Sequence, residues 1–258
     1  MPDQSGIFYT EKGSGFPVIL IHGFCETHEI WNSFSELLSK EFRIICIDLP
    51  GFGKSELLKA GFSITDVGSA VLRFTDSLKI KECIVIGHSL GGYVLLAMME
   101  QRPELFKAFG LFHSTAFADT EERKQSRNKV IEFVTKHGVE PFIQSFIPPL
   151  FHDQNNPAIP NVVRLASQTK LETLVGYTKA MRDRPDRTNV LKNFKSSILF
   201  IAGEKDGGIT PESIKQQAAV AAQSIVHILP SVAHMGMFEN KELSVKKIHE
   251  FLLEQFKK

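Results

Sequence analysis

Short apolar runs alternate with segments of helical periodicity along the first part of the chain. Four continuous apolar runs are typical of strands covered on both faces of a sheet: residues 17–21, 43–47, 83–86 and 106–112. A shorter strand is expected near residues 7–10. Between the runs, apolar positions recur at steps of three and four, which predicts helices over residues 30–40, 67–78 and 93–101. This order of elements indicates an α/β fold with a mostly parallel sheet and helices on both faces.

The alternation stops after residue 114 and resumes near residue 197. The intervening segment has helical patterns but no further buried strand, and its helices are expected over residues 121–137 and 161–181. The last strands and helices are then expected over residues 197–202, 211–222, 225–229 and 239–256. We therefore predict a core domain made of residues 1–114 and 188–258. Residues 115–187 are predicted to form a helical cap, or lid, over the strand ends.

Residues 87–92 read Gly-His-Ser-Leu-Gly-Gly and lie between an apolar strand run and an apolar helical run. A strand that turns at once into a helix forces its corner residue into strained dihedral angles, and small neighbours leave room for that turn. Ser89 at the tip would then point its hydroxyl out of the backbone, as a nucleophile requires. The alternative is that the Gly-Gly pair merely ends one element and loosens the next.

Other residues with useful chemistry also follow predicted strands directly. Gly23 lets the backbone leave its strand sharply, so the amide of Phe24 can face the space above the sheet. Asp206 and His234 follow the last two strands. Because parallel sheets bind ligands beyond the carboxyl ends of their strands, these residues are expected to meet at one edge. The loop at residues 48–55 matches neither the dinucleotide fingerprint nor the P-loop pattern, so no phosphate cofactor is expected.

Taken together, these motifs resemble the α/β-hydrolase family over essentially the full length of the chain. The motifs that carry the resemblance are His22-Gly23-Phe24, the loop at residues 48–55, the Ser89 segment, Gly203-Glu204-Lys205-Asp206 and Ala233-His234. The order Ser, Asp, His along the chain matches that fold. In the numbering of the family's strands, the cap would follow the sixth. Only one clear strand precedes residue 18, where many relatives have a hairpin, which leaves open that one strand is missing at the N-terminal edge.

The resemblance implies a catalytic triad of Ser89, Asp206 and His234. A serine hydroxyl is a poor nucleophile at neutral pH, so His234 would take its proton and Asp206 would orient the imidazole. The backbone amides of Phe24 and Leu90 are the natural donors for the negative charge that develops on the substrate oxygen. Glu204 and Asp119 are the reserve candidates for the acid.

Four aromatic and aliphatic residues of the cap, with Trp31 of the core domain nearby, are candidates for a substrate pocket. The candidates are Trp31, Phe142, Phe146, Leu150 and Phe151. For each of them, plain packing inside the cap or core is an equal alternative. Twenty-one phenylalanines against one tryptophan and three tyrosines fit either a greasy pocket or a Phe-rich core.

Composition narrows the possible partners. The 258 residues include 30 basic and 29 acidic side chains, for a net charge of +1, so neither a nucleic acid nor a membrane partner is expected. The three cysteines, Cys25, Cys46 and Cys83, lack zinc-ligand spacing, and buried thiols in a reduced, cytoplasmic compartment are expected. No metal or other cofactor is expected, and the sequence leaves the oligomeric state open.

We interpret the chain as a serine hydrolase, resembling capped carboxylesterases, that cleaves a small-molecule ester through an acyl-enzyme. A serine nucleophile argues against dehalogenases and epoxide hydrolases, whose chemistry needs a carboxylate. Three alternatives stay open: a carbon–carbon bond hydrolase, an acyltransferase or perhydrolase with the same triad, and a ligand-binding signalling protein that retains a hydrolase shell.

Overall fold

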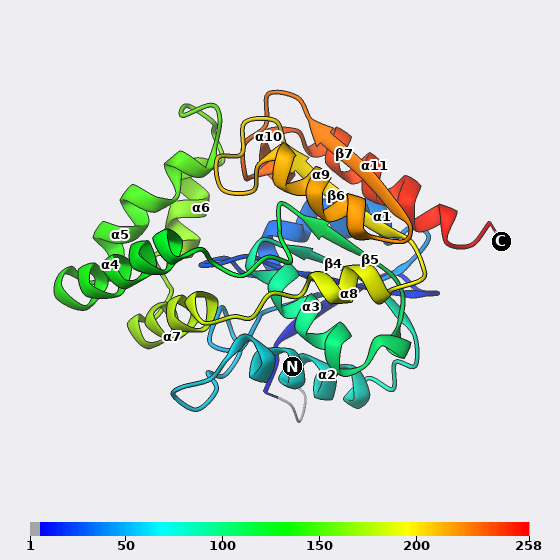
Figure 1. Cartoon of the computed structure of the whole chain (residues 1–258), viewed down its shortest axis with the longest axis horizontal. Helices are drawn as coiled ribbons and strands as arrows, with labels where there is room; N and C mark the ends of the chain where they lie inside the picture. Colours follow the sequence, from blue (N-terminus) through cyan, green and yellow to red (C-terminus); the bar gives the residue numbers. More distant parts are fainter. Residues whose placement is uncertain (1–5, 258) are drawn as a thin grey trace.

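A computed structural model, which describes residues 6–257, contains a seven-stranded sheet with helices on both faces (Figure 1). The strands are β1 (Tyr9–Lys12), β2 (Pro17–Ile21), β3 (Arg43–Ile47), β4 (Cys83–His88), β5 (Phe106–Phe112), β6 (Ile198–Gly203) and β7 (Ser224–Leu229). Their order across the sheet is β1-β3-β2-β4-β5-β6-β7. Every neighbouring pair is parallel except β1 with β3. The predicted fold class is confirmed.

The N-terminal edge of the sheet is formed by β1. This strand pairs antiparallel with β3, with Tyr9 opposite Ile47, and lies about two residues later than the segment predicted from the sequence. Within residues 6–257 it is the one strand that precedes β2. In the described part of the chain, the N-terminal edge of the sheet therefore has one strand, where many relatives have a hairpin of two.

The two faces of the sheet are covered by different helices. In β2, Ile19 and Ile21 pack into the core cluster that includes α2 (Ile64–Ser77), α3 (Leu90–Gln101), α8 (Thr188–Asn193) and α9 (Pro211–Val220). Val18 and Leu20 point the other way, into the cluster that includes α1 (Asn32–Leu38) and α11 (Lys241–Glu254). This is the alternation that a strand buried on both faces requires.

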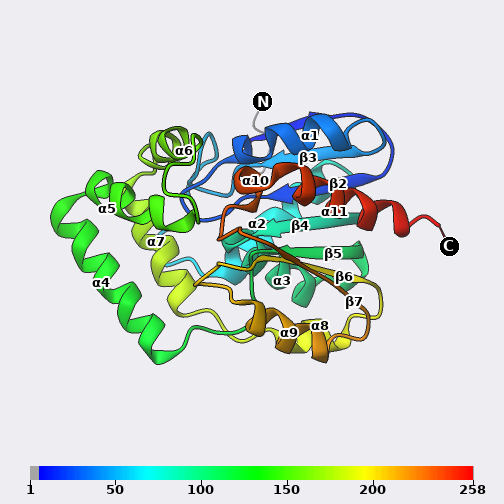
Figure 2. The same cartoon turned by 90° about the horizontal axis from the view of Figure 1, so that it is seen from above.

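Four helices gather at one end of the sheet, in the chain segment between β5 and β6 (Figures 1 and 2). They are α4 (Glu121–His137), α5 (Val139–Phe146), α6 (Ile159–Ala166) and α7 (Leu171–Arg182). Figure 2 shows them beyond the ends from which β4 and β5 lead into their following segments. By contrast, α8 packs against α3 and α9. The helical character predicted for this segment is therefore correct.

One predicted helix is two helices in the structure. The periodic pattern predicts a continuous helix over residues 161–181, but α6 ends at Ala166 and α7 begins at Leu171. Ser167, Gln168 and Thr169 form turns back onto the last carbonyl groups of α6, and Lys170 is extended. Ser and Thr compete with helical hydrogen bonding, and the apolar period continues in register across the break, which hides it in the sequence.

The predicted helices at residues 30–40 and 239–256 differ at their ends. The first begins as a 3-10 turn, His28–Trp31, and continues as α1. Within α1, Leu37 is 45% exposed although it is apolar. Near the C-terminus, a short helix, α10 (Gly236–Glu239), is followed by Asn240, which caps α11 by accepting from the amide of Leu243. Two further 3-10 turns are Pro103–Leu105 and Pro148–Leu150. Over the described residues, every helix is too short or too polar to cross a membrane.

Candidate active site

Ser89 occupies the corner between β4 and α3 in a strained backbone conformation. Its φ and ψ are 48° and −113°, a region that L-residues rarely adopt. The corner is tight because Gly87 packs directly on α3 and Gly91 on β2: a Cβ at Gly91 would lie 2.4 Å from the carbonyl oxygen of Ile21. Strain of this kind costs about 1–3 kcal/mol and persists only where packing enforces it. The sequence pattern at residues 87–92 therefore has a direct steric basis.

His234 and Asp206 come from the loops that follow β7 and β6. The Nδ1 atom of His234 lies 2.7 Å from Oδ2 of Asp206. The amides of Gly208 and Ile209 donate to the other carboxylate oxygen of Asp206, at 2.8 and 2.9 Å. The His234 amide donates in turn to the carbonyl of Leu150, at 2.9 Å. Both the carboxylate and the imidazole are thus held from several directions.

The electrostatic environment of this pair favours a carboxylate beside a basic imidazole. Burial raises the pKa of Asp206, but the charge of His234 and the hydrogen bonds of His113 and His234 outweigh it and hold that pKa well below its usual range. Burial lowers the pKa of His234, yet the Asp206 charge and hydrogen bond raise it above 6.5. Asp206 is therefore ionised at neutral pH and stabilises a proton on His234.

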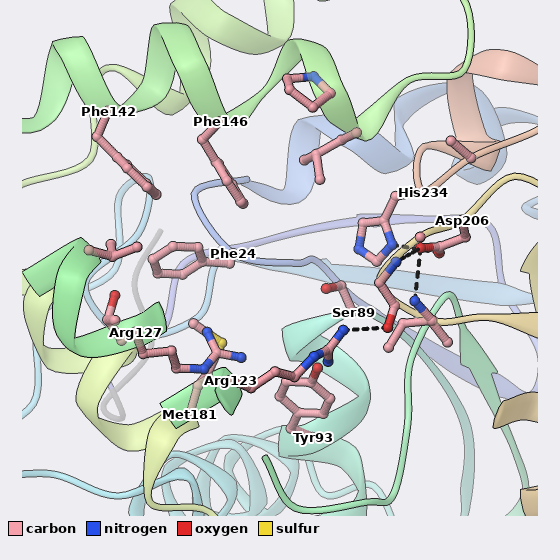
Figure 3. A pocket seen from close by; sticks show the side chains of 18 residues that line it. Phe24, Ser89, Tyr93, Arg123, Arg127, Phe142, Phe146, Met181, Asp206 and His234 are labelled. Atoms are coloured by element: carbon pink, nitrogen blue, oxygen red, sulfur yellow. Dashed lines mark hydrogen bonds and ion pairs between the residues drawn. The ribbon is translucent and has the colours of Figure 1, made fainter. Parts of the chain in front are cut away.

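Ser89 and His234 face the same pocket (Figure 3). In the described part of the chain, the Ser89 hydroxyl forms no hydrogen bond with His234, whereas the Ser89 carbonyl accepts from the hydroxyl of Ser114 at 2.7 Å. Contacts between a nucleophile and its base are often long without substrate and shorten when substrate binds. The arrangement has the order and placement of a nucleophile, a base and an orienting acid.

The amides of Phe24 and Leu90 have no acceptor among the residues that the structure describes. Leu90 is the first residue of α3, where backbone N–H groups are free and the helix dipole favours negative charge. The Phe24 ring lines the pocket. The two amides predicted from the sequence are therefore unused donors, one of them directly after Ser89 and the other in a residue that lines the same pocket.

The sequence did not predict two buried histidine–carboxylate pairs that lie beside Asp206 and His234. Oε2 of Glu26 accepts from the Gly23 amide at 2.5 Å and lies 2.9 Å from Nδ1 of His88. The other nitrogen of His88 lies 3.1 Å from the carbonyl oxygen of His234. Burial raises the pKa of Glu26, but His88 and the neighbouring donors lower it below its usual value. The Glu26–His88 pair therefore ties the loop after β2 to the loop that carries His234.

His113 forms the second missed pair. Its Nδ1 lies 3.2 Å from Oδ2 of Asp206, and it directly follows β5 with a φ of 48°. Burial lowers its pKa to about 4, so the side chain is neutral. His113, Asp206 and His234 bring potential metal-ligand atoms within 4.8 Å of one another, but their hydrogen bonds already engage Asp206 Oδ2 and both Nδ1 atoms. The only sequence signal for His113 is its position directly after a predicted strand.

The pocket has a volume of about 390 Å³ and is lined by three of the five predicted aromatic and aliphatic residues. The rings of Phe142 and Phe146 stack with their centroids 5.0 Å apart, and the centroids of Phe146 and Phe24 are 5.9 Å apart. Together with Leu150 these rings form an apolar wall of the pocket. The predictions for the other two residues are wrong. Trp31 is fully buried between Phe34 and Phe112, and buried Phe151 packs against Phe238. Both rings pack in the core, and a large apolar ring suits a core as well as it suits a pocket.

Neither reserve acid contacts His234. Glu204 accepts from the Ser231 amide at 3.2 Å and faces solvent beside Lys205. Asp119 pairs with Arg127 and with Arg184. Cys25 is also outside the pocket: it is buried, and burial raises the pKa of its thiol well above the usual value. Burial likewise raises the pKa values of Cys46 and Cys83 to about 12.

Comparisons with known proteins agree with this architecture. The family profile described as the alpha/beta hydrolase fold matches residues 17–241. The uncharacterized hydrolase YugF and a putative 2-succinyl-6-hydroxy-2,4-cyclohexadiene-1-carboxylate synthase, both from Bacillus subtilis, are each 25% identical and aligned over 91% of this chain and 89% of their own length. A thermophilic esterase from Thermogutta terrifontis is 26% identical, with a TM-score of 0.92 over 96% of this chain and 93% of its own. The chain belongs to the α/β-hydrolase fold family.

Proposed function

We propose that this protein is a serine hydrolase that cleaves a small-molecule carboxylic ester through an acyl-enzyme at Ser89. The observation that carries the proposal is the placement of the His234–Asp206 pair in the same pocket as a serine on a strained strand-to-helix corner. The similarity to the Thermogutta terrifontis esterase supports this choice among the reactions of the family. We further propose that residues 115–187 form the cap that closes the pocket.

The proposed reaction begins when the Ser89 hydroxyl attacks the ester carbonyl carbon while Nε2 of His234 takes its proton. The amides of Phe24 and Leu90 donate to the oxyanion, which is a contribution of about 3–4 kcal/mol for each donor of this kind. The C–O bond to the alcohol then breaks, and His234 returns the proton to the departing oxygen. Water, deprotonated by His234, releases the acid. Ester and water are thus converted into acid and alcohol, and the enzyme is restored.

The proposal is tested by covalent labelling with a fluorophosphonate probe. We expect the wild-type protein to be labelled at Ser89, as located by peptide mass spectrometry, and to hydrolyse short and medium acyl esters. Ser89→Ala should abolish both while leaving the thermal unfolding midpoint near that of the wild type. Ser114→Ala is the control, because it removes a nearby serine hydroxyl that donates to the Ser89 carbonyl. This variant should still be labelled at Ser89. A wild-type protein that stays unmodified at Ser89 overturns the proposal.

A further inference from the structure

The cap side of the pocket carries more arginine charge than its carboxylate can balance. Arg127 and Arg184 both pair with Asp119, the latter at 2.7 Å. Arg184 is almost fully buried, and its guanidinium lies 4.0 Å from the ring centroid of Tyr93, which lines the pocket. One carboxylate thus serves two guanidinium groups, and the surplus positive charge is next to the site of chemistry.

Arg123 adds a third guanidinium that has no acidic partner among residues 6–257. It comes from the first turn of α4 and lines the pocket with Ser89 and His234, and Figure 3 shows its side chain extending toward Ser89. Within the described residues, its side chain forms one hydrogen bond, to the carbonyl oxygen of Gly208 at 2.5 Å. A guanidinium has five N–H donors, so most of them stay available in the pocket.

Two acidic groups near Arg123 are already engaged by other partners. Glu121 on the same helix pairs with Lys124 at 2.7 Å. Asp206, in the loop that Arg123 contacts, is used by His113 and His234. The charge of Arg123 nevertheless reaches the reaction centre, since it lowers the pKa of His234. A cation in this position is left to be matched by a ligand.

We propose that Arg123 binds a free carboxylate on the substrate, and that the substrates are half-esters of short dicarboxylic acids. This inference rests on the esterase activity proposed above. A guanidinium binds a carboxylate through two parallel hydrogen bonds, and both charges strengthen those bonds. The pocket volume of about 390 Å³ suits a small ligand. Phe24, Phe142 and Phe146 supply an apolar wall for the alkyl parts of such a molecule.

The test compares pairs of ethyl esters of nearly equal shape. Monoethyl succinate, glutarate and adipate carry a carboxylate where ethyl levulinate, ethyl 5-oxohexanoate and ethyl 6-oxoheptanoate carry a neutral methyl ketone. Acid release is followed by pH-stat at neutral pH. We expect the wild type to favour at least one half-ester over its ketone partner by roughly 10- to 100-fold in kcat/KM, the range for one charge-assisted hydrogen bond. Arg123→Gln should bring the ratio of kcat/KM for the half-ester to kcat/KM for its ketone partner close to one.

Lys124→Gln is the matched control, because it removes the same charge from the next residue of α4, outside the pocket, and should leave the preference intact. Ser89 labelling of each variant separates this inference from the proposed function. Labelled wild-type protein that hydrolyses half-esters no faster than ketone esters overturns the inference alone. Equal losses of kcat/KM on the half-ester and the ketone ester in Arg123→Gln would also overturn the inference. Such losses would show that Arg123 acts by holding the loop that carries Asp206. Absence of labelling refutes the esterase activity itself.

Discussion

The corner that presents Ser89 and the cap wall opposite it are built in contrasting ways. At the corner every residue of β4 is buried, and Gly87 and Gly91 pack against backbone atoms at distances that exclude a Cβ. On the cap side, only Val134 of the 17 residues of α4 is buried, while Arg123 and Phe146 are half-buried at the pocket. The corner tolerates almost no change, whereas the cap wall can change its side chains without disturbing the sheet.

This contrast matches two different roles, that of the reacting groups and that of the groups that contact the substrate. Reacting groups need fixed geometry, which the ends of hydrogen-bonded sheet strands provide. Substrate-contacting groups need only the right shape and charge, which helices at the pocket mouth can supply. We therefore expect substitutions at the corner to lower turnover for every substrate, and substitutions in the cap wall to change the preference among substrates.

The largest effect is expected from Asp206→Asn. An amide cannot stabilise the proton on His234 and favours the wrong tautomer, so kcat should fall by about 10⁴ for all esters. In the wild type, kcat/KM should decline as the pH falls through the pKa of His234, which lies above 6.5, because only the neutral imidazole acts as a base. Steady-state kinetics measured across a range of pH give both the fall in kcat for Asp206→Asn and the pH dependence of kcat/KM for the wild type.

Glu204→Gln is the control for this substitution, since Glu204 does not contact His234 and should keep full turnover. Near-normal turnover in Asp206→Asn would show that the acid of the corner lies elsewhere.

A smaller effect is expected from Glu26→Gln, which tests whether the corner extends to the Glu26–His88 pair. Loss of the charge should loosen the loop after β2 and lower kcat by roughly 10- to 100-fold, the size of effect that small misplacements produce. The negative charge of Glu26 also raises the pKa of His234. The acid limb of kcat/KM should therefore move to lower pH in Glu26→Gln, a shift that a purely structural defect would not cause.

Glu29→Gln is the matched control, because this exposed carboxylate lies on the same loop-to-helix segment. A Glu26→Gln enzyme with reduced kcat but an unmoved acid limb would limit Glu26 to holding the loop.

The sequence predicted the corner far better than its surroundings, and the reason is physical. Ser89, Asp206 and His234 each follow a strand, and a parallel sheet brings strand ends together without further information. The Glu26–His88 contact joins residues 62 positions apart whose pairing depends on how two loops pack, which no local pattern encodes. Trp31 was misplaced because an aromatic residue in a helical pattern fits a pocket as well as a core. From the sequence, Arg123 is one of many charged residues expected on the solvated face of a helix. Only the structure shows that it lines the pocket with Ser89.

The smallest effect is expected from the cap wall, where Phe146→Ala and Phe151→Ala form a matched pair. Phe146 lines the pocket, and its loss should lower kcat/KM for longer acyl chains by about tenfold relative to short ones, as expected for one lost hydrophobic contact. Phe151 is buried away from the pocket, so its loss should cost about 3–5 kcal/mol of unfolding free energy and leave acyl-chain preference unchanged. Acyl-chain panels and denaturant unfolding measure the two responses. If Phe151→Ala alone altered the preference, the cap would act through its core and not through the surface it presents to Ser89.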